Sequence, residues 1–151
     1  DKTDDLLNQT PPHNIDIEKA LLASLMSIEE AYDKIADIVT KDDFYAGRHQ
    51  YIFDAIAHLA AVNEPYDTVM VHDWLEAQKL LKIFDRITSV NIVLEKIKDF
   101  EYETQIVANV PQKTLTIHEK DEELIKSVDL GIDKMQRQIR KYKGHFNSKN
   151  T

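Results

Sequence analysis

Residues 67–87 read DTVMVHDWLEAQKLLKIFDRI, and this stretch decides how the rest of the chain is interpreted. Its apolar residues recur at alternating spacings of four and three: Met70, Trp74, Ala77, Leu81 and Phe84, widened by Val71, Leu75, Leu80 and Ile83. This pattern predicts one amphipathic helix over 67–87, with an apolar surface wide enough to face neighbours on two sides. Asp67 or Thr68 is suited to cap its first turn.

The sequence before this stretch predicts helices. Residues 1–13 are polar and end in a Pro-Pro-His run, so we expect a flexible lead-in. A first helix begins at Asn14, and Ser27-Ile28-Glu29-Glu30 has the pattern of a capping box that opens a second helix. A loop with two aromatic residues leads into a third helix over 48–62. Residues 14–80 are therefore predicted to form a helical part.

After residue 87, the spacing of the apolar residues changes from a helical period to strict alternation. Alternating apolar residues predict three antiparallel strands over 88–95, 101–110 and 113–118. A last helix is predicted over about 121–143, with Gly131 allowing close approach to the sheet. The predicted fold class is α+β: the helical part shares the helix 67–87 with an α-β-β-β-α unit over 82–144, and 145–151 form a tail.

Composition and charge exclude several classes of protein. The chain has no cysteine, which excludes disulfide scaffolds, thiolate zinc sites and cysteine nucleophiles. No apolar run approaches the roughly 20 residues of a membrane span, so we expect a cytoplasmic protein without a membrane partner. The net charge is −8, but residues 1–81 carry −10 and residues 82–151 carry +2. The second part could meet a polyanion, or its charges could simply be solvated.

Motifs for catalysis and cofactor binding are not found. The six histidines have no metal-ligand spacing such as H-E-x-x-H, and the carboxylates are spread over helix surfaces. A phosphate-binding G-x-x-x-x-G-K-[ST] motif is absent, since the only glycines are Gly47, Gly131 and Gly144. We therefore predict a protein that is not an enzyme, with no catalytic residue, no cofactor and no metal site.

The one positive functional feature is the end of the last predicted helix. From residue 134 to residue 149 there are six basic residues and no acidic one. The candidate RNA-binding residues are Lys134, Arg137, Arg140, Lys141 and Lys143. Cations at the C-terminus of a helix also interact favourably with its dipole and aid solubility, so RNA binding and simple solvation both remain open.

Four motifs follow one another within residues 11–80: PPHNIDIEKALLASLM, EEAYDKIADIVTKDDFY, RHQYIFDAIAHLA and NEPYDTVMVHDWLEAQ. This part of the chain resembles the N-terminal domain of the bacterial replicative DNA helicase. The resemblance implies an all-helical domain that forms a collar on a hexameric ring and contacts neighbouring subunits and primase. The family continues with a Gly-Gly turn and a further helical hairpin, and this sequence departs from that pattern.

The last predicted helix contains the signature Asp129-x-x-Ile132-Asp133-Lys134-x-x-Arg137-Gln138-x-x-Lys141. Through this signature, residues 84–143 resemble a second family, the ribosome hibernation-promoting factor or ribosome-associated inhibitor. The resemblance implies binding to the small ribosomal subunit through basic residues of the last helix. The first strand and half of the first helix of that family are missing, and the helix 67–87 takes the place of the missing half.

Two hypotheses follow from these resemblances. The first is an artificial chimera of the two families, without a dedicated function, that binds ribosomal or other structured RNA weakly through its last helix. The alternative is a natural protein-interaction module, associated with replication or the ribosome, that self-associates as a homodimer through its helicase-like helices. Natural fusions usually join complete domains through exposed linkers, which favours the chimera.

Overall fold

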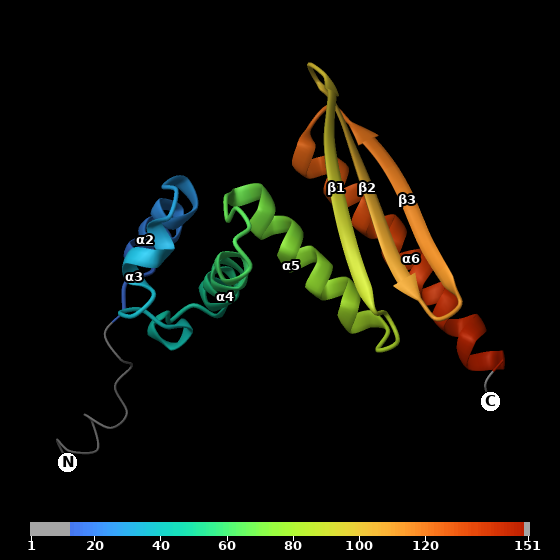
Figure 1. Ribbon diagram of the computed structural model, residues 1–151, viewed down its shortest axis with the longest axis horizontal. Helices are drawn as coiled ribbons and strands as arrows, with labels where there is room; N and C mark the ends of the chain where they lie inside the picture. Colours follow the sequence, from blue (N-terminus) through green and yellow to red (C-terminus); the bar gives the residue numbers. More distant parts are fainter. Residues whose placement is uncertain (1–12, 150–151) are drawn as a thin grey trace, which may run out of the picture. The chain divides into compact units, whose positions relative to one another are not determined.

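The computed structural model describes residues 13–149, which belong to two compact units, one ending at Val71 and the other beginning at His72. The elements, in chain order (Figure 1), are α2 (Ile15–Ser27), α3 (Ala31–Ile35), η1 (Lys41–Asp43), α4 (Gly47–Ala61), α5 (Thr68–Ile83), β1 (Ser89–Lys98), β2 (Glu101–Val110), β3 (Lys113–Asp121) and α6 (Leu124–Lys149). The predicted α+β class is confirmed. Of the lead-in predicted over 1–13, only His13 lies within the described residues.

The first unit is built around the contact between α2 and α4. Asn14 caps α2, because its Oδ1 accepts hydrogen bonds from the amides of Asp16 and Ile17 at 3.0 and 3.1 Å. The buried apolar side chains of this unit include Leu22, Leu25, Phe44, Phe53, Ala55, Ile56 and Leu59. Phe44 therefore folds back onto the core, whereas the neighbouring Tyr45 is exposed and stacks on the His13 ring.

The predicted capping box at Ser27 is wrong. Helix α2 continues through this residue, since the Ile28 amide still donates to the Ser24 carbonyl at 3.0 Å. The Ser27 hydroxyl lies inside the helix and donates to the Ala23 carbonyl at 2.7 Å, so it cannot cap the next helix. Helix α3 begins instead after Glu30, a residue with φ of 59° that makes no side-chain cap. It has only five residues.

Helix α5 is continuous but shorter than the predicted 67–87. Asp67 caps it, with Oδ1 accepting from the Met70 amide at 2.9 Å. The helix ends at Ile83, four residues early, because Phe84 and Ile87 leave the helical path and become buried in the core of the second unit. The Ile87 amide donates to the Phe84 carbonyl at 3.2 Å and closes this turn.

The second unit contains an antiparallel sheet in the order β1-β2-β3. Strand β2 has the predicted bounds, and its inward residues Thr104, Ile106, Ala108 and Val110 are buried. Strands β1 and β3 each extend three residues beyond their predicted ends. Tight turns join the strands, with Phe100 at φ 58° in the first and Gln112 at φ 67° in the second.

Helix α6 lies along one face of the sheet (Figure 1) and packs on β2 and β3. Its buried apolar stripe is Val128, Ile132, Met135 and Ile139. Gly131 permits the close approach that the sequence predicted, since a Cβ at this position would lie 3.0 Å from Ile117 Cδ1 and 3.2 Å from Ile106 Cδ1. The buried hydroxyls of Thr104 and Ser127 hydrogen-bond each other at 2.7 Å, so neither is left unsatisfied in the core.

The end of α6 differs from the prediction, which placed a tail at residues 145–151. The helix continues through Lys149, past the predicted end at 143. Phe146 explains the extension, because its ring centroid lies 5.5 Å from that of Phe84 and 6.1 Å from that of Tyr142. This aromatic cluster ties the last turns of the helix to the core. Although α6 has 26 residues, no helix within residues 13–149 is apolar and long enough to cross a bilayer.

Candidate functional site

The helical unit has a groove of about 590 Å³ bordered by the end of α2 and the chain that precedes α5. The apolar residues lining it are Leu25, Met26, Ile28, Ala60, Pro65 and Tyr66. Leu25 is buried, whereas the Ile28 residue, at the C-cap of α2, is 54% exposed. A buried apolar floor beside an exposed isoleucine is a surface that favours contact with another apolar group.

Aromatic side chains attach one wall of this groove to the core. The Tyr66 hydroxyl accepts a hydrogen bond from the Tyr32 amide at 3.1 Å. Tyr66 therefore satisfies an amide in the first turn of α3, where the Glu30 side chain makes no capping hydrogen bond. The Tyr32 ring contacts Tyr66 at a centroid distance of 6.4 Å and Phe53 at 5.8 Å. The groove is therefore supported by the same rings that form the centre of the unit.

The rim of the groove is acidic. The charged residues lining it are Glu29, Glu30, Asp33, Glu64 and Asp67, and no Lys or Arg is among the described residues that line it. One of them, Asp67, also caps α5. A rim of this charge disfavours polyanions and leaves apolar or basic surfaces as suitable occupants.

A buried carboxylate, Glu18, joins α2 to the start of α4. It accepts hydrogen bonds from the amides of Tyr45 and Ala46 at 3.2 and 3.3 Å, and it lies 3.1 Å from Nδ1 of the buried His49. Burial alone raises the pKa of Glu18, but the hydrogen bonds from His49 and from the two amides together hold it below the usual 4.5. All these partners belong to the protein, so the pair fits a structural role better than a catalytic one.

The five candidate RNA-binding residues are all on α6, and their surroundings differ. The Lys134 Nζ lies 2.6 Å from Glu119 Oε2 in an ion pair, and the half-buried Lys143 donates to the Ile83 carbonyl at 3.1 Å. Arg137, Arg140 and Lys141 are exposed and make no ion pair with other residues in the described part of the chain. Three cations thus remain available to a polyanion.

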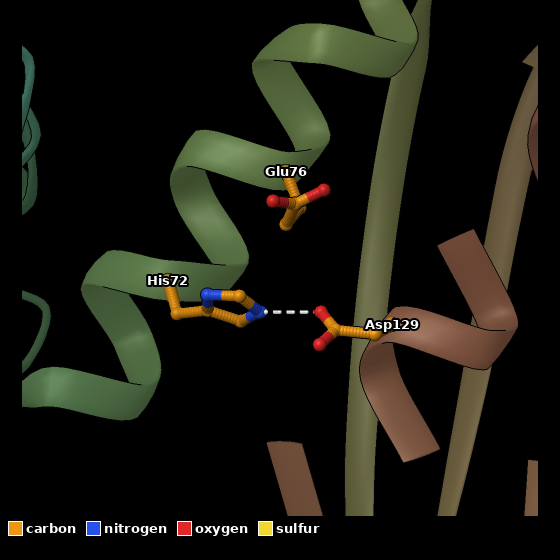
Figure 2. Close-up of side chains that lie close together, drawn as sticks. All are labelled: His72, Glu76 and Asp129. Atoms are coloured by element: carbon orange, nitrogen blue, oxygen red, sulfur yellow. Dashed lines mark hydrogen bonds and ion pairs between the residues drawn. The ribbon is translucent and has the colours of Figure 1, made fainter. Parts of the chain in front are cut away.

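A further cluster lies in the second unit and was missed by the sequence analysis. His72 and Glu76 are on α5 and Asp129 is on α6, and Figure 2 shows the His72 ring directed at the Asp129 carboxylate. The His72 Nε2 and Asp129 Oδ1 atoms are 3.0 Å apart, and one ligand-type atom from each of the three residues lies within 4.8 Å of the others. The spacing of four between His72 and Glu76 was a usable signal, but Asp129 is 57 residues from His72.

Comparison with known proteins finds one family. The model of the family described as "DnaB-like helicase N terminal domain" matches residues 10–120. Among similar curated proteins, Replicative DNA helicase DnaB of Synechocystis sp. is 32% identical over 93 residues, which cover 54% of this chain and 11% of that protein. The protein of the same name from Leifsonia xyli is 33% identical over 67 residues, covering 44% and 15%. That of Treponema pallidum is 24% identical over 114 residues, covering 74% and 26%.

These matches cover only a minor part of each relative, from 11% to 26% of its length. They also revise the boundary that the sequence analysis placed at residue 80, since the family match continues over the sheet to residue 120. They give no support to a ribosome hibernation factor over 84–143 or to a chimera joined within α5. The alternating pattern predicted the strands correctly, but a β-β-β-α order is common to unrelated folds and does not identify a family.

Proposed function

We propose, since the chain belongs to the DnaB-like helicase N-terminal domain family, that it is a non-catalytic protein-interaction module that self-associates through the groove of its helical unit. The observation that carries this proposal is the groove itself, with its apolar floor and the exposed Ile28 beside it. A role beside the replication machinery would place the protein in the cytoplasm.

Physical reasons favour a second copy as the occupant of the groove. When two copies of one surface pair about a two-fold axis, each apolar patch covers the other, and this is the commonest arrangement of homodimers. The acidic rims of two copies repel each other, so the contact is weak at low ionic strength. Salt screens this repulsion and leaves the apolar contact in place, so we expect association to strengthen with salt.

The substitution Ile28→Asp tests this surface. It places a charge on the apolar contact and adds to the acidic rim, so we expect the dimer dissociation constant to rise by about 30-fold, the equivalent of about 2 kcal/mol for loss of a central apolar contact. Analytical ultracentrifugation over a range of protein concentrations, at low and high salt, measures the constant.

Ile38→Asp is the matched control, because Ile38 is 75% exposed in the same unit but does not line the groove. It should leave the dissociation constant unchanged. A parent protein that stays monomeric at every concentration and salt would contradict the proposal. Equal effects of Ile28→Asp and Ile38→Asp would show that association does not use the groove.

RNA binding is a second candidate function, supported by three of the candidate residues on α6 that are exposed and make no ion pair within the described residues: Arg137, Arg140 and Lys141. Such binding would be weak and independent of sequence, because phosphate contacts by cations carry no base information. Three contacts predict that log affinity falls with log salt with a slope of about −2 to −3. Salt therefore acts on RNA binding and on self-association in opposite directions.

The double substitution Arg137→Glu with Lys141→Glu should abolish RNA binding at low salt without unfolding the protein, since both side chains are exposed. Fluorescence anisotropy with a labelled structured RNA measures the loss. Lys113→Glu with Lys126→Glu changes the net charge equally at two exposed positions away from the helix end, and it should retain most of the affinity. If both variants lose affinity equally, or if the parent does not bind RNA, the basic end of α6 is only a solvated surface and not an RNA-binding site.

A further inference from the structure

We propose that His72, Glu76 and Asp129 form a binding site for one divalent transition-metal cation, with Zn²⁺ as the preferred ion. The three residues come from two helices of the second unit, and their ligand-type atoms lie within 4.8 Å of one another (Figure 2). The site shares no residue with the groove of the helical unit.

The donor set selects the class of ion. One imidazole nitrogen and two carboxylate oxygens suit Zn²⁺, which is often held by three such protein ligands with water in a fourth position. Mg²⁺ and Ca²⁺ prefer sites made of oxygen alone, so an imidazole disfavours them. With a neutral imidazole, the three side chains carry two negative charges, which a divalent cation neutralises.

The geometry is close to what a tetrahedral ion needs. Ligand bonds of about 2.0–2.1 Å place ligand atoms roughly 3.4 Å apart. His72 Nε2 and Asp129 Oδ1 are already 3.0 Å apart, and the spacing of four puts His72 and Glu76 on the same face of α5. Glu76 is the residue that must adjust, because its Oε1 now lies 3.0 Å from Lys79 Nζ. An exposed lysine can yield to a cation by rotating into solvent.

A bound ion would connect α5 to α6. At present the hydrogen bond between His72 and Asp129 joins the first half of α5 to α6, and the bond from Lys143 to the Ile83 carbonyl joins the end of α5 to α6. An ion that binds the folded protein and not the unfolded chain stabilises the fold in proportion to its occupancy.

Isothermal titration calorimetry of the full chain with ZnCl₂, after treatment with a chelator, tests the site. We expect one Zn²⁺ per chain and much weaker binding of Mg²⁺. His72→Ala and Asp129→Asn should each weaken Zn²⁺ binding by at least about tenfold, since even loss of a residue that only supports a ligand costs 10- to 100-fold. Circular dichroism establishes that each variant is folded, and Asp129→Asn keeps the side-chain shape.

His118→Ala is the matched control. His118 is an exposed histidine of the same unit, 3.0 Å from a single carboxylate, Glu103, with Lys120 also beside that carboxylate. The His118→Ala variant should bind Zn²⁺ with the same affinity as the parent protein. Visible absorption of bound Co²⁺ gives a second readout, which should lose intensity in His72→Ala but not in His118→Ala. Equal binding by the parent and His72→Ala, or no binding by the parent, would overturn the proposal.

Discussion

Phe84→Ala should lower the free energy of unfolding of the second unit by about 3–5 kcal/mol, the usual loss for a buried phenylalanine. Phe84 is 2% exposed and belongs to the core that the sheet and α6 form. Its ring lies 6.1 Å from Tyr142 and 5.5 Å from Phe146, between centroids. The substitution would leave a cavity at the place where the chain leaves α5, and the last turns of α6 would lose their contact with the core.

Urea denaturation followed by circular dichroism measures the loss, and hydrogen exchange of peptides from α6 locates it. Phe100→Ala is the control, because Phe100 is 80% exposed at the turn between β1 and β2. It should change the free energy of unfolding by less than about 1 kcal/mol. If the two variants are equally stable, the aromatic cluster does not hold the end of α6 to the core.

Phe53→Ala should destabilise the first unit by a similar amount, about 3–5 kcal/mol. Phe53 is 3% exposed, and its ring centroid lies 5.0 Å from that of Phe44 and 5.8 Å from that of Tyr32. Because Tyr32 also contacts Tyr66 at the groove, we expect the groove to lose its support and self-association to weaken together with stability.

Hydrogen exchange of peptides from α2 and α4 reports the stability of this unit, and ultracentrifugation reports association. Tyr51→Ala is the control on the same helix, since Tyr51 is 58% exposed. Within residues 13–149, its ring makes one cation–π contact, with the side chain of Lys41. The Tyr51→Ala variant should leave exchange nearly unchanged. Unaltered exchange in Phe53→Ala would mean that the aromatic cluster contributes little to this unit.

The sequence predicts most of the fold because two kinds of periodicity are clear in it. The strict alternation in β2 gave both ends of that strand, and the spacing of Val128, Ile132, Met135 and Ile139 gave the buried face of α6. Element ends were harder to predict where tertiary contacts decide them. Phe84 leaves α5 and Phe146 prolongs α6 because the two rings meet, and they are 62 positions apart in a sequence that shows no local sign of that contact.

The candidate sites were less predictable than the fold. The groove depends on Tyr66 reaching the amide of Tyr32, and a contact of this kind has no sequence motif. The basic stretch was visible in the sequence, but the contacts of its lysines were not. Lys134 forms an ion pair with Glu119, and Lys143 donates to the Ile83 carbonyl. The second family resemblance depended on a short signature in a helix, where the order of polar residues is set mainly by which face is solvated.

Within residues 13–149, four residues other than glycine have left-handed backbone conformations: Glu30, Asn63, Phe100 and Gln112, with φ between 58° and 67°. Of the described glycines, none has a positive φ, so the residue best suited to such positions is not used there. Natural sequences need only enough stability to function, and positions of this kind are where stability can still be gained. The turns of the sheet are therefore places where this protein can still gain stability: glycine at Phe100 or Gln112 should offset part of a destabilising change in the core of the second unit, while the surfaces proposed for binding stay as they are.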